Sequence, residues 1–87
     1  MKPTAKQLMF AYEQGLRLTY AAEEKNLSAC PGSFFNIKYN VCTVFVYDPE
    51  SENNRTIYDL QTISISNSES IKKHVDEAIL AIEKYNA

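Results

Sequence analysis

Residues 41–47 read VCTVFVY, and this run decides how the rest of the chain is arranged. Side chains alternate between the two faces of a β-strand, so the odd-numbered residues point one way and the even-numbered residues the other. Both sets are largely apolar, and such a strand needs cover on both faces. Only two segments of the chain have helical periodicity, enough to cover one face of a small sheet. We therefore expect the second face to meet a second copy of the chain or a different protein.

The length of 87 residues predicts a single small domain over residues 1–87. Hydrophobic residues make up 45% of the chain and charged residues 23%, which is typical of a folded globular domain. The net charge of -2 lacks the basic excess of most dedicated nucleic-acid binders. A domain of this size buries only about 60% of its unfolded surface, so oligomerisation would add stability that the monomer lacks.

The N-terminal segment contains no continuous apolar run that would indicate a signal peptide. The sequence also lacks the roughly 18 consecutive apolar residues that a transmembrane helix requires. We therefore expect a cytoplasmic protein with no membrane contact. In that compartment Cys30 and Cys42 would be reduced thiols, one in a loop and one within the apolar strand, whereas a disulfide between them would require an oxidising compartment.

A first helix is predicted from Thr4 onward, because Thr4 and Gln7 match the T-x-x-Q capping box. Gly15 in the middle of this helix would let another backbone or a bulky aromatic residue approach closely. Asn26 is a candidate for the left-handed residue that ends the helix. The apolar stripe expected to face the core comprises Leu8, Met9, Tyr12, Leu16 and Tyr20, and a second, shallower side comprises Ala11, Leu18 and Ala22.

From residue 34 the periodicity changes to two, which predicts β-structure up to residue 47. No Gly or Pro interrupts this stretch, so one continuous strand is favoured over two strands that turn near residues 38–40. The polar residues 48–54 predict a hairpin loop. The returning strand over residues 55–66 switches its phase near residues 59–61, which indicates a bulge or a break into two strands.

A second helix near the C-terminus is the clearest element in the chain. Ser66 and Glu69 match the S-x-x-E capping box ahead of it. The element order is therefore α-β-β-α, or α-β-β-β-α if the β-stretch is broken. We expect an α+β fold in which a small antiparallel sheet of two to three strands carries both helices on one face. The core-facing side chains of the second helix are predicted to be Ile71, Val75, Ala78, Ile79, Ile82 and Tyr85.

The sequence contains no pattern typical of a catalytic, cofactor-binding or metal-binding site. A structural zinc site needs about four Cys or His ligands, and Cys30, Cys42 and His74 are the only candidates. A reactive thiol at Cys30 with His74 as its base would require basic neighbours that lower the thiol pKa, and none lies near Cys30 in sequence. We therefore expect no metal, no cofactor and no enzymatic activity.

The hairpin loop is the candidate partner-binding surface. Asp48, Glu50 and Glu52 form the only local concentration of acidic residues, and at the end of a stiff hairpin they would steer a basic partner. Tyr47 and Tyr58 flank the hairpin and would add rigid contact area with a polar tip. A solvated hairpin tip without a partner is the alternative.

The favoured function is a non-enzymatic protein-binding module that acts through surface contacts, with an unidentified protein and a second copy of the chain as partners. Stand-alone domains of this kind are common among viral inhibitors. By analogy with that class of proteins, one hypothesis is that the chain is a phage-encoded anti-defence (anti-CRISPR-like) protein. A nucleic-acid-binding module that stacks bases on sheet aromatics is the first alternative, although residues 28–67 contain only Lys38 and Arg55 as basic residues. A small thiol-dependent enzyme is the second alternative.

Overall fold

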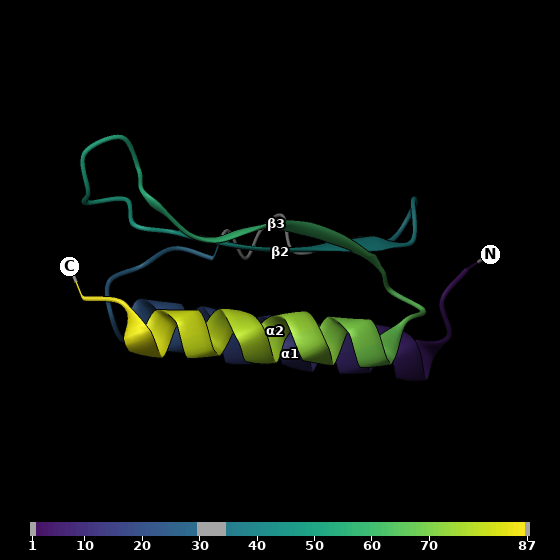
Figure 1. The fold of residues 1–87 in the computed structure, drawn as a ribbon. Coiled ribbons are helices and arrows are strands. Elements are labelled where there is room, and N and C mark those ends of the chain that lie inside the picture. The colour runs from purple at the N-terminus through teal and green to yellow at the C-terminus, as the bar shows by residue number, and fades with distance from the viewer. Residues whose placement is uncertain (1, 30–34, 87) are drawn as a thin grey trace.

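A computed structural model describes residues 2–29 and 35–86 of the chain. Its elements follow the order α1 (Ala5–Glu23), β1 (Phe35–Asn36), β2 (Val41–Tyr47), β3 (Thr56–Ser64) and α2 (Ser68–Lys84). The three strands form one antiparallel sheet in the order β1-β2-β3. The two helices pack against each other in a second layer beneath one face of the sheet (Figure 1). The predicted α+β fold with both helices on one face is confirmed.

The N-terminal helix α1 begins and ends where its sequence indicates. The Thr4 hydroxyl accepts the N–H of Gln7 at 3.1 Å, and the Gln7 side chain accepts the N–H of Thr4 at 2.8 Å, which completes the predicted capping box. At the other end Asn26 has a φ of 58°, a left-handed conformation that Asn tolerates better than most residues. The N–H of Leu27 then donates to the carbonyl of Ala22 at 2.9 Å, the long hydrogen bond of a Schellman motif.

The stretch before residue 47 is not the continuous strand that was favoured from the sequence. It forms β1, a turn over residues 37–40, and β2, so the alternative of two strands is correct. The chain reverses without Gly or Pro because Asn40 adopts a φ of 54°. The Asn40 side-chain amide donates to the hydroxyls of Ser64 and Ser66 at 3.3 and 3.1 Å, which fixes the turn against the end of β3.

The strands β2 and β3 form the hairpin predicted around residues 48–54. Asn53 and Asn54, with φ values of 65° and 49°, provide the left-handed conformations in its loop. The register shifts between the pairs that contain Val44 and Val46, where β3 supplies one more residue than β2. This bulge accounts for the phase switch that the sequence indicates near residues 59–61.

The helix α2 begins one residue later than the predicted capping box implies. Its N-cap is Asn67, whose side-chain oxygen accepts the N–H of Ser70 at 3.1 Å, while the Ser66 hydroxyl lies 3.4 Å from the side-chain oxygen of Asn40. Asn caps a helix as well as Ser does, so the sequence pattern does not separate two neighbouring candidates. The predicted core side of α2 is buried at Ile71, Val75, Ala78 and Ile82 and half-buried at Ile79 and Tyr85.

The core-facing side of α1 was predicted wrongly. Leu8 is half-buried, but the four other large residues of the expected stripe are exposed, Tyr12 and Tyr20 included. The packed side of α1 consists largely of small side chains, which let the helix approach its neighbours closely, and the larger residues of the expected stripe lie on the other side of the helix. The buried residues of α1 are Ala11, Gln14, Gly15, Leu18 and Ala22.

Charged side chains tie α1 to α2 at two levels. Near the middle of the helices Arg17 pairs with Asp76 at 2.9 Å, and Lys72 pairs with the same carboxylate at 2.7 Å. The hydrogen bonds from Lys72 and Arg17 lower the pKa of Asp76. At the end of α2 the Lys25 ammonium donates to three carbonyls, those of Ile82, Glu83 and Tyr85, at 2.9, 2.8 and 3.2 Å.

Candidate protein-binding surface

Large apolar side chains line the outer side of α1, opposite its packed side. Met9, Tyr12, Leu16 and Tyr20, called the α1 stripe below, recur at i, i+3, i+7 and i+11 and therefore share one helix face. These residues are between 38% and 65% exposed. Single exposed hydrophobic residues are ordinary on a protein surface, whereas a contiguous apolar row marks an interaction site. Helical segments commonly contact their partners through anchor residues at this spacing.

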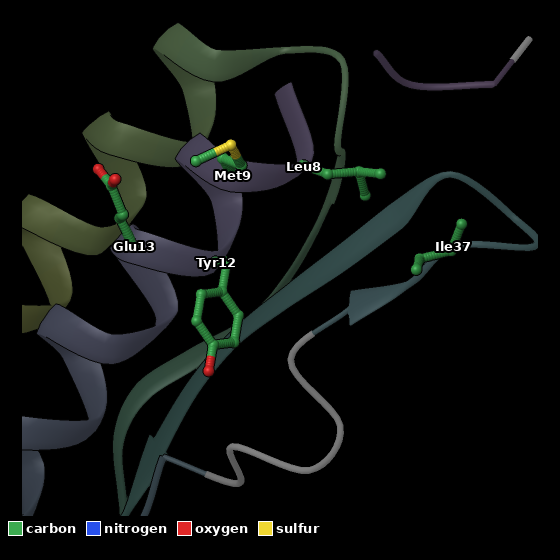
Figure 2. A pocket seen from close by; sticks show the side chains of 5 residues that line it. All are labelled: Leu8, Met9, Tyr12, Glu13 and Ile37. Carbon is green, nitrogen blue, oxygen red and sulfur yellow. The ribbon is translucent and has the colours of Figure 1, made fainter. Parts of the chain in front are cut away.

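A pocket of about 300 Å³ opens beside the N-terminal end of the α1 stripe (Figure 2). The helix provides one wall and the turn after β1 the other, with Leu8 and Ile37 on opposite sides. Met9, Tyr12 and Glu13 complete the lining among the described residues. Anchor residues at protein interfaces are typically held in pockets, so this recess offers a partner a place to insert a side chain.

Asp48, one of the predicted partner-binding residues, is turned inward. It is 5% exposed, and its carboxylate accepts the hydroxyl of Tyr85 at 2.7 Å and the N–H of Glu50 at 3.0 Å. The hydrogen bond from Tyr85 is the main cause that lowers the pKa of Asp48. The same bond raises the pKa of Tyr85. Asp48 thus fastens the hairpin to the residues that follow α2.

Glu50 and Glu52 are exposed at the tip of the hairpin, as expected. Tyr47 is half-buried at the end of β2, where its ring stacks on Phe45 with 5.6 Å between the centroids. The hairpin therefore keeps two acidic side chains and part of one aromatic ring at its surface, and partner binding there stays a prediction. A second pocket, of about 360 Å³, is lined by Lys25, Asn26, Asp48, Glu50, Ser51 and Tyr85.

Tyr58, the fifth predicted partner-binding residue, faces α2 instead of the hairpin surface. Its hydroxyl lies 2.7 Å from Nδ1 of His74 and 3.2 Å from a carboxylate oxygen of Glu77. Burial raises the pKa of Tyr58 to about 12, and the negative charge and hydrogen bond of Glu77 add to this shift. His74 is half-buried in this cluster. Tyr58 therefore joins β3 to α2, and the structure does not bring it together with the acidic residues of the hairpin.

On β2 the face of the sheet that points away from the helices is half-buried, whereas β3 carries exposed residues, among them Leu60 at 59%. Burial alternates along β2, so that Cys42, Val44 and Val46 are fully buried and the intervening residues are half-buried. The contact of this outer face with a second copy of the chain stays a prediction. The half-buried residues are Val41, Thr43, Phe45 and Tyr47.

The described thiol is a core side chain. Cys42 is buried, and its burial raises the thiol pKa to about 11, so the nucleophilic thiolate is scarce at neutral pH. Cys30 lies outside the described residues. Across residues 2–29 and 35–86, no three His, Cys, Asp or Glu side chains are grouped as a metal site would require. The helices in this part of the chain are too short or too polar to span a membrane.

The α1 stripe is the surface that the sequence reasoning missed, because its size and apolar character assigned it to the core. A signal for the correct side is present in the sequence. Ala11, Gly15, Leu18 and Ala22 follow the spacing i, i+4, i+7 and i+11, and three of these four residues are small. A helix side made of small residues marks close packing, whereas the opposite side is free to carry large side chains.

No protein-family model, curated protein or solved structure matches the chain.

Proposed function

We propose that the protein is a non-enzymatic binding module that holds another polypeptide against the α1 stripe and the adjoining pocket. The supporting observation is the exposure of four large apolar residues on one face of a helix whose opposite face is packed. Their burial on a partner would remove apolar surface from water, which contributes about 25 cal/mol per Å².

The composition of the stripe suits a protein contact. Tyr12 and Tyr20 provide rigid area with few rotatable bonds, and their hydroxyls tolerate water at the rim of an interface. Met9 is flexible and polarizable, so it adapts to an irregular partner surface. Leu16 lies between the two tyrosines along the helix and would be the most enclosed residue of the contact.

The hairpin provides a second surface in this proposal. The exposed carboxylates of Glu50 and Glu52 would attract a basic region of a partner and speed its association. The module would inhibit a bound enzyme if that enzyme needs the covered surface for its own activity. The anti-defence role, suggested by analogy with small viral inhibitors, would be one case of such inhibition.

A photo-crosslinking amino acid at Met9 tests the proposal, with irradiation of the purified chain alone and in an extract of its native host. We expect a covalent adduct with a second polypeptide. Leu16→Glu should weaken the contact at least about 30-fold and abolish the adduct, because it places a charge in the centre of an apolar interface. Leu80→Glu is the matched control, since Leu80 is 51% exposed on α2 and lies outside the stripe.

The proposal is wrong if no adduct forms, or if Leu16→Glu leaves the adduct unchanged. The thermal midpoints of both variants should stay close to that of the wild type, because neither residue belongs to the core.

A further inference from the structure

One flank of the α1 stripe carries charges in an alternating order. Lys6, Glu13, Arg17 and Glu24 are all exposed. At 3.6 residues per turn they fall within about 40° of one another around the helix axis. From the N-terminus to the C-terminus their charges read plus, minus, plus, minus.

Most of these charges have no salt-bridge partner among residues 2–29 and 35–86. Among the described residues, Lys6, Glu13 and Glu24 form no salt bridge. Arg17 bonds Asp76 and Gln14, and its guanidinium has five N–H donors, so further donors remain for another carboxylate. The flank therefore presents charges of both signs beside an apolar row.

The order of the charges is self-complementary when the helix is reversed. If two copies of α1 lie antiparallel about a two-fold axis at the level of Gly15, Lys6 faces Glu24 of the second copy, and Glu13 faces Arg17 of the second copy. The symmetry repeats each pair, so four pairs of opposite charge form and no pair of like charge. A parallel two-fold pair would instead set this flank against the opposite flank of the second copy, which lacks the alternating charges.

The same alignment brings the apolar residues of the stripe together. With the axis at residue 15, Met9 lies within one helical position of Tyr20 of the second copy, and Tyr12 lies within two positions of Leu16 of the second copy. At a rise of about 1.5 Å per residue, offsets of one or two positions keep these side chains in contact range. The Leu16 residues of the two copies meet close to the axis.

We infer that the occupant of the α1 stripe is a second copy of this chain, bound through an antiparallel α1–α1 contact. This inference rests on the proposed function and names its partner. It places the contact between copies on the helical layer, where the alternating charges lie, and not on the outer face of the sheet. The charges on the flank fix the direction and register of the contact, and the stripe supplies its apolar centre.

Sedimentation of the purified chain at concentrations up to about 100 μM tests the inference through charge reversals. We expect the wild type to dimerise. Lys6→Glu and Glu24→Lys should each weaken the dimer about tenfold, because each creates two pairs of like charge at the contact. The double variant Lys6→Glu/Glu24→Lys should return close to the wild-type affinity, since it restores opposite charges in exchanged positions.

Lys73→Glu is the matched control, because it changes the net charge as Lys6→Glu does but alters an exposed residue of α2. It should leave the dimer unchanged. The inference is overturned if the wild type is monomeric, if the single reversals leave its affinity unchanged, or if the double variant does not restore it.

The outcomes separate the inference from the proposed function. A monomeric chain that crosslinks through the stripe to a different protein retains the proposed function and loses the inference. A dimer that is insensitive to both Leu16→Glu and the charge reversals also overturns the inference, because another surface, such as the outer face of the sheet, then forms the contact. Both statements are wrong if no contact of any kind depends on the stripe.

Discussion

The two helices of this protein use their large side chains in opposite ways. The C-terminal helix α2 buries Ile71, Val75 and Ile82 beneath the sheet and exposes mainly charged residues. The N-terminal helix α1 buries mostly small residues, together with Leu18 and Gln14, and exposes its methionine, one leucine and both tyrosines. Both helices show an apolar side in the sequence, yet only in α2 does the larger apolar side belong to the core. The difference teaches that an apolar helix side has two possible destinations, the core of its own chain or a surface outside it.

Truncation of the buried Leu18 and of the exposed Leu16 of α1 should give the largest difference and is the strongest test of this comparison. Leu18→Ala should lower the free energy of unfolding by about 2–5 kcal/mol, because it leaves a cavity at a fully buried position. Leu16→Ala should change it by no more than about 0.5 kcal/mol at protein concentrations too low for association. Urea denaturation of both variants provides the measurement. Equal losses would show that the two sides of α1 are assigned wrongly.

Enlargement of Gly15 sharpens the comparison, because this residue lies on the packed side of α1. Gly15→Leu should destabilise the fold by about 1–3 kcal/mol, since the side chain has no space between α1 and its neighbours. Gly15→Ala is the control that adds one methyl group and improves helix propensity by about 1 kcal/mol. A gain in stability for both variants, measured by urea denaturation, would contradict the close packing of this side.

The cap of α2 tests how far this helix depends on its own N-terminus. Asn67→Ala should cost about 1 kcal/mol, because the N–H of Ser70 loses the side-chain oxygen that accepts it. Asn67→Asp should retain stability, since a carboxylate accepts the same hydrogen bond and favours the positive end of the helix dipole. Thermal unfolding should give a lower midpoint for Asn67→Ala than for Asn67→Asp. Equal midpoints would indicate that Ser66, and not Asn67, caps the helix.

The polar contact between α2 and β3 predicts a smaller, pH-dependent effect. The pKa of Tyr58 is raised from its usual value of 10 to about 12, so the folded chain holds the phenol proton more tightly than the unfolded chain does. The stability from this proton is complete below pH 10 and is lost as the pH rises through about 12. Wild type should therefore lose more stability than Tyr58→Phe between these pH values.

Cys42, whose pKa is raised to about 11, contributes to alkaline instability in both proteins and cancels in their difference. Parallel curves of thermal midpoint against pH for wild type and Tyr58→Phe would contradict the prediction, because they would show that the pKa of Tyr58 is the same in the folded and the unfolded chain.

The periodicity of the sequence was enough to predict the fold class, the α1 capping box, the hairpin, the bulge in β3 and the core side of α2. Each of these depends on local pattern or on a single strongly amphipathic face. The turn before β2 was only the less favoured alternative, because Asn40, not Gly or Pro, adopts the left-handed conformation. The N-cap of α2 was placed one residue early because Ser66 and Asn67 are both good caps.

Less of the candidate site than of the fold could be predicted from the sequence. Which side of α1 packs depends on the distance between α1, α2 and the sheet, a tertiary property that hydrophobicity alone does not encode. The inward position of Asp48 depends on Tyr85, a residue that follows α2 and lies 37 positions away. The exposure of Glu50 and Glu52, in contrast, follows from their place in a polar loop.

The bonds from Lys25 to the end of α2 have a consequence for the order of events during synthesis. The last carbonyls of a helix have no partner within it, and here the side chain of Lys25, 57 positions before Ile82, satisfies three carbonyls at this end. A ribosome releases Lys25 well before the end of α2, so these bonds form only after the residues up to Tyr85 have emerged. A nascent chain that stalls before residue 82 would therefore lack the hydrogen bonds that join Lys25 to this end of α2.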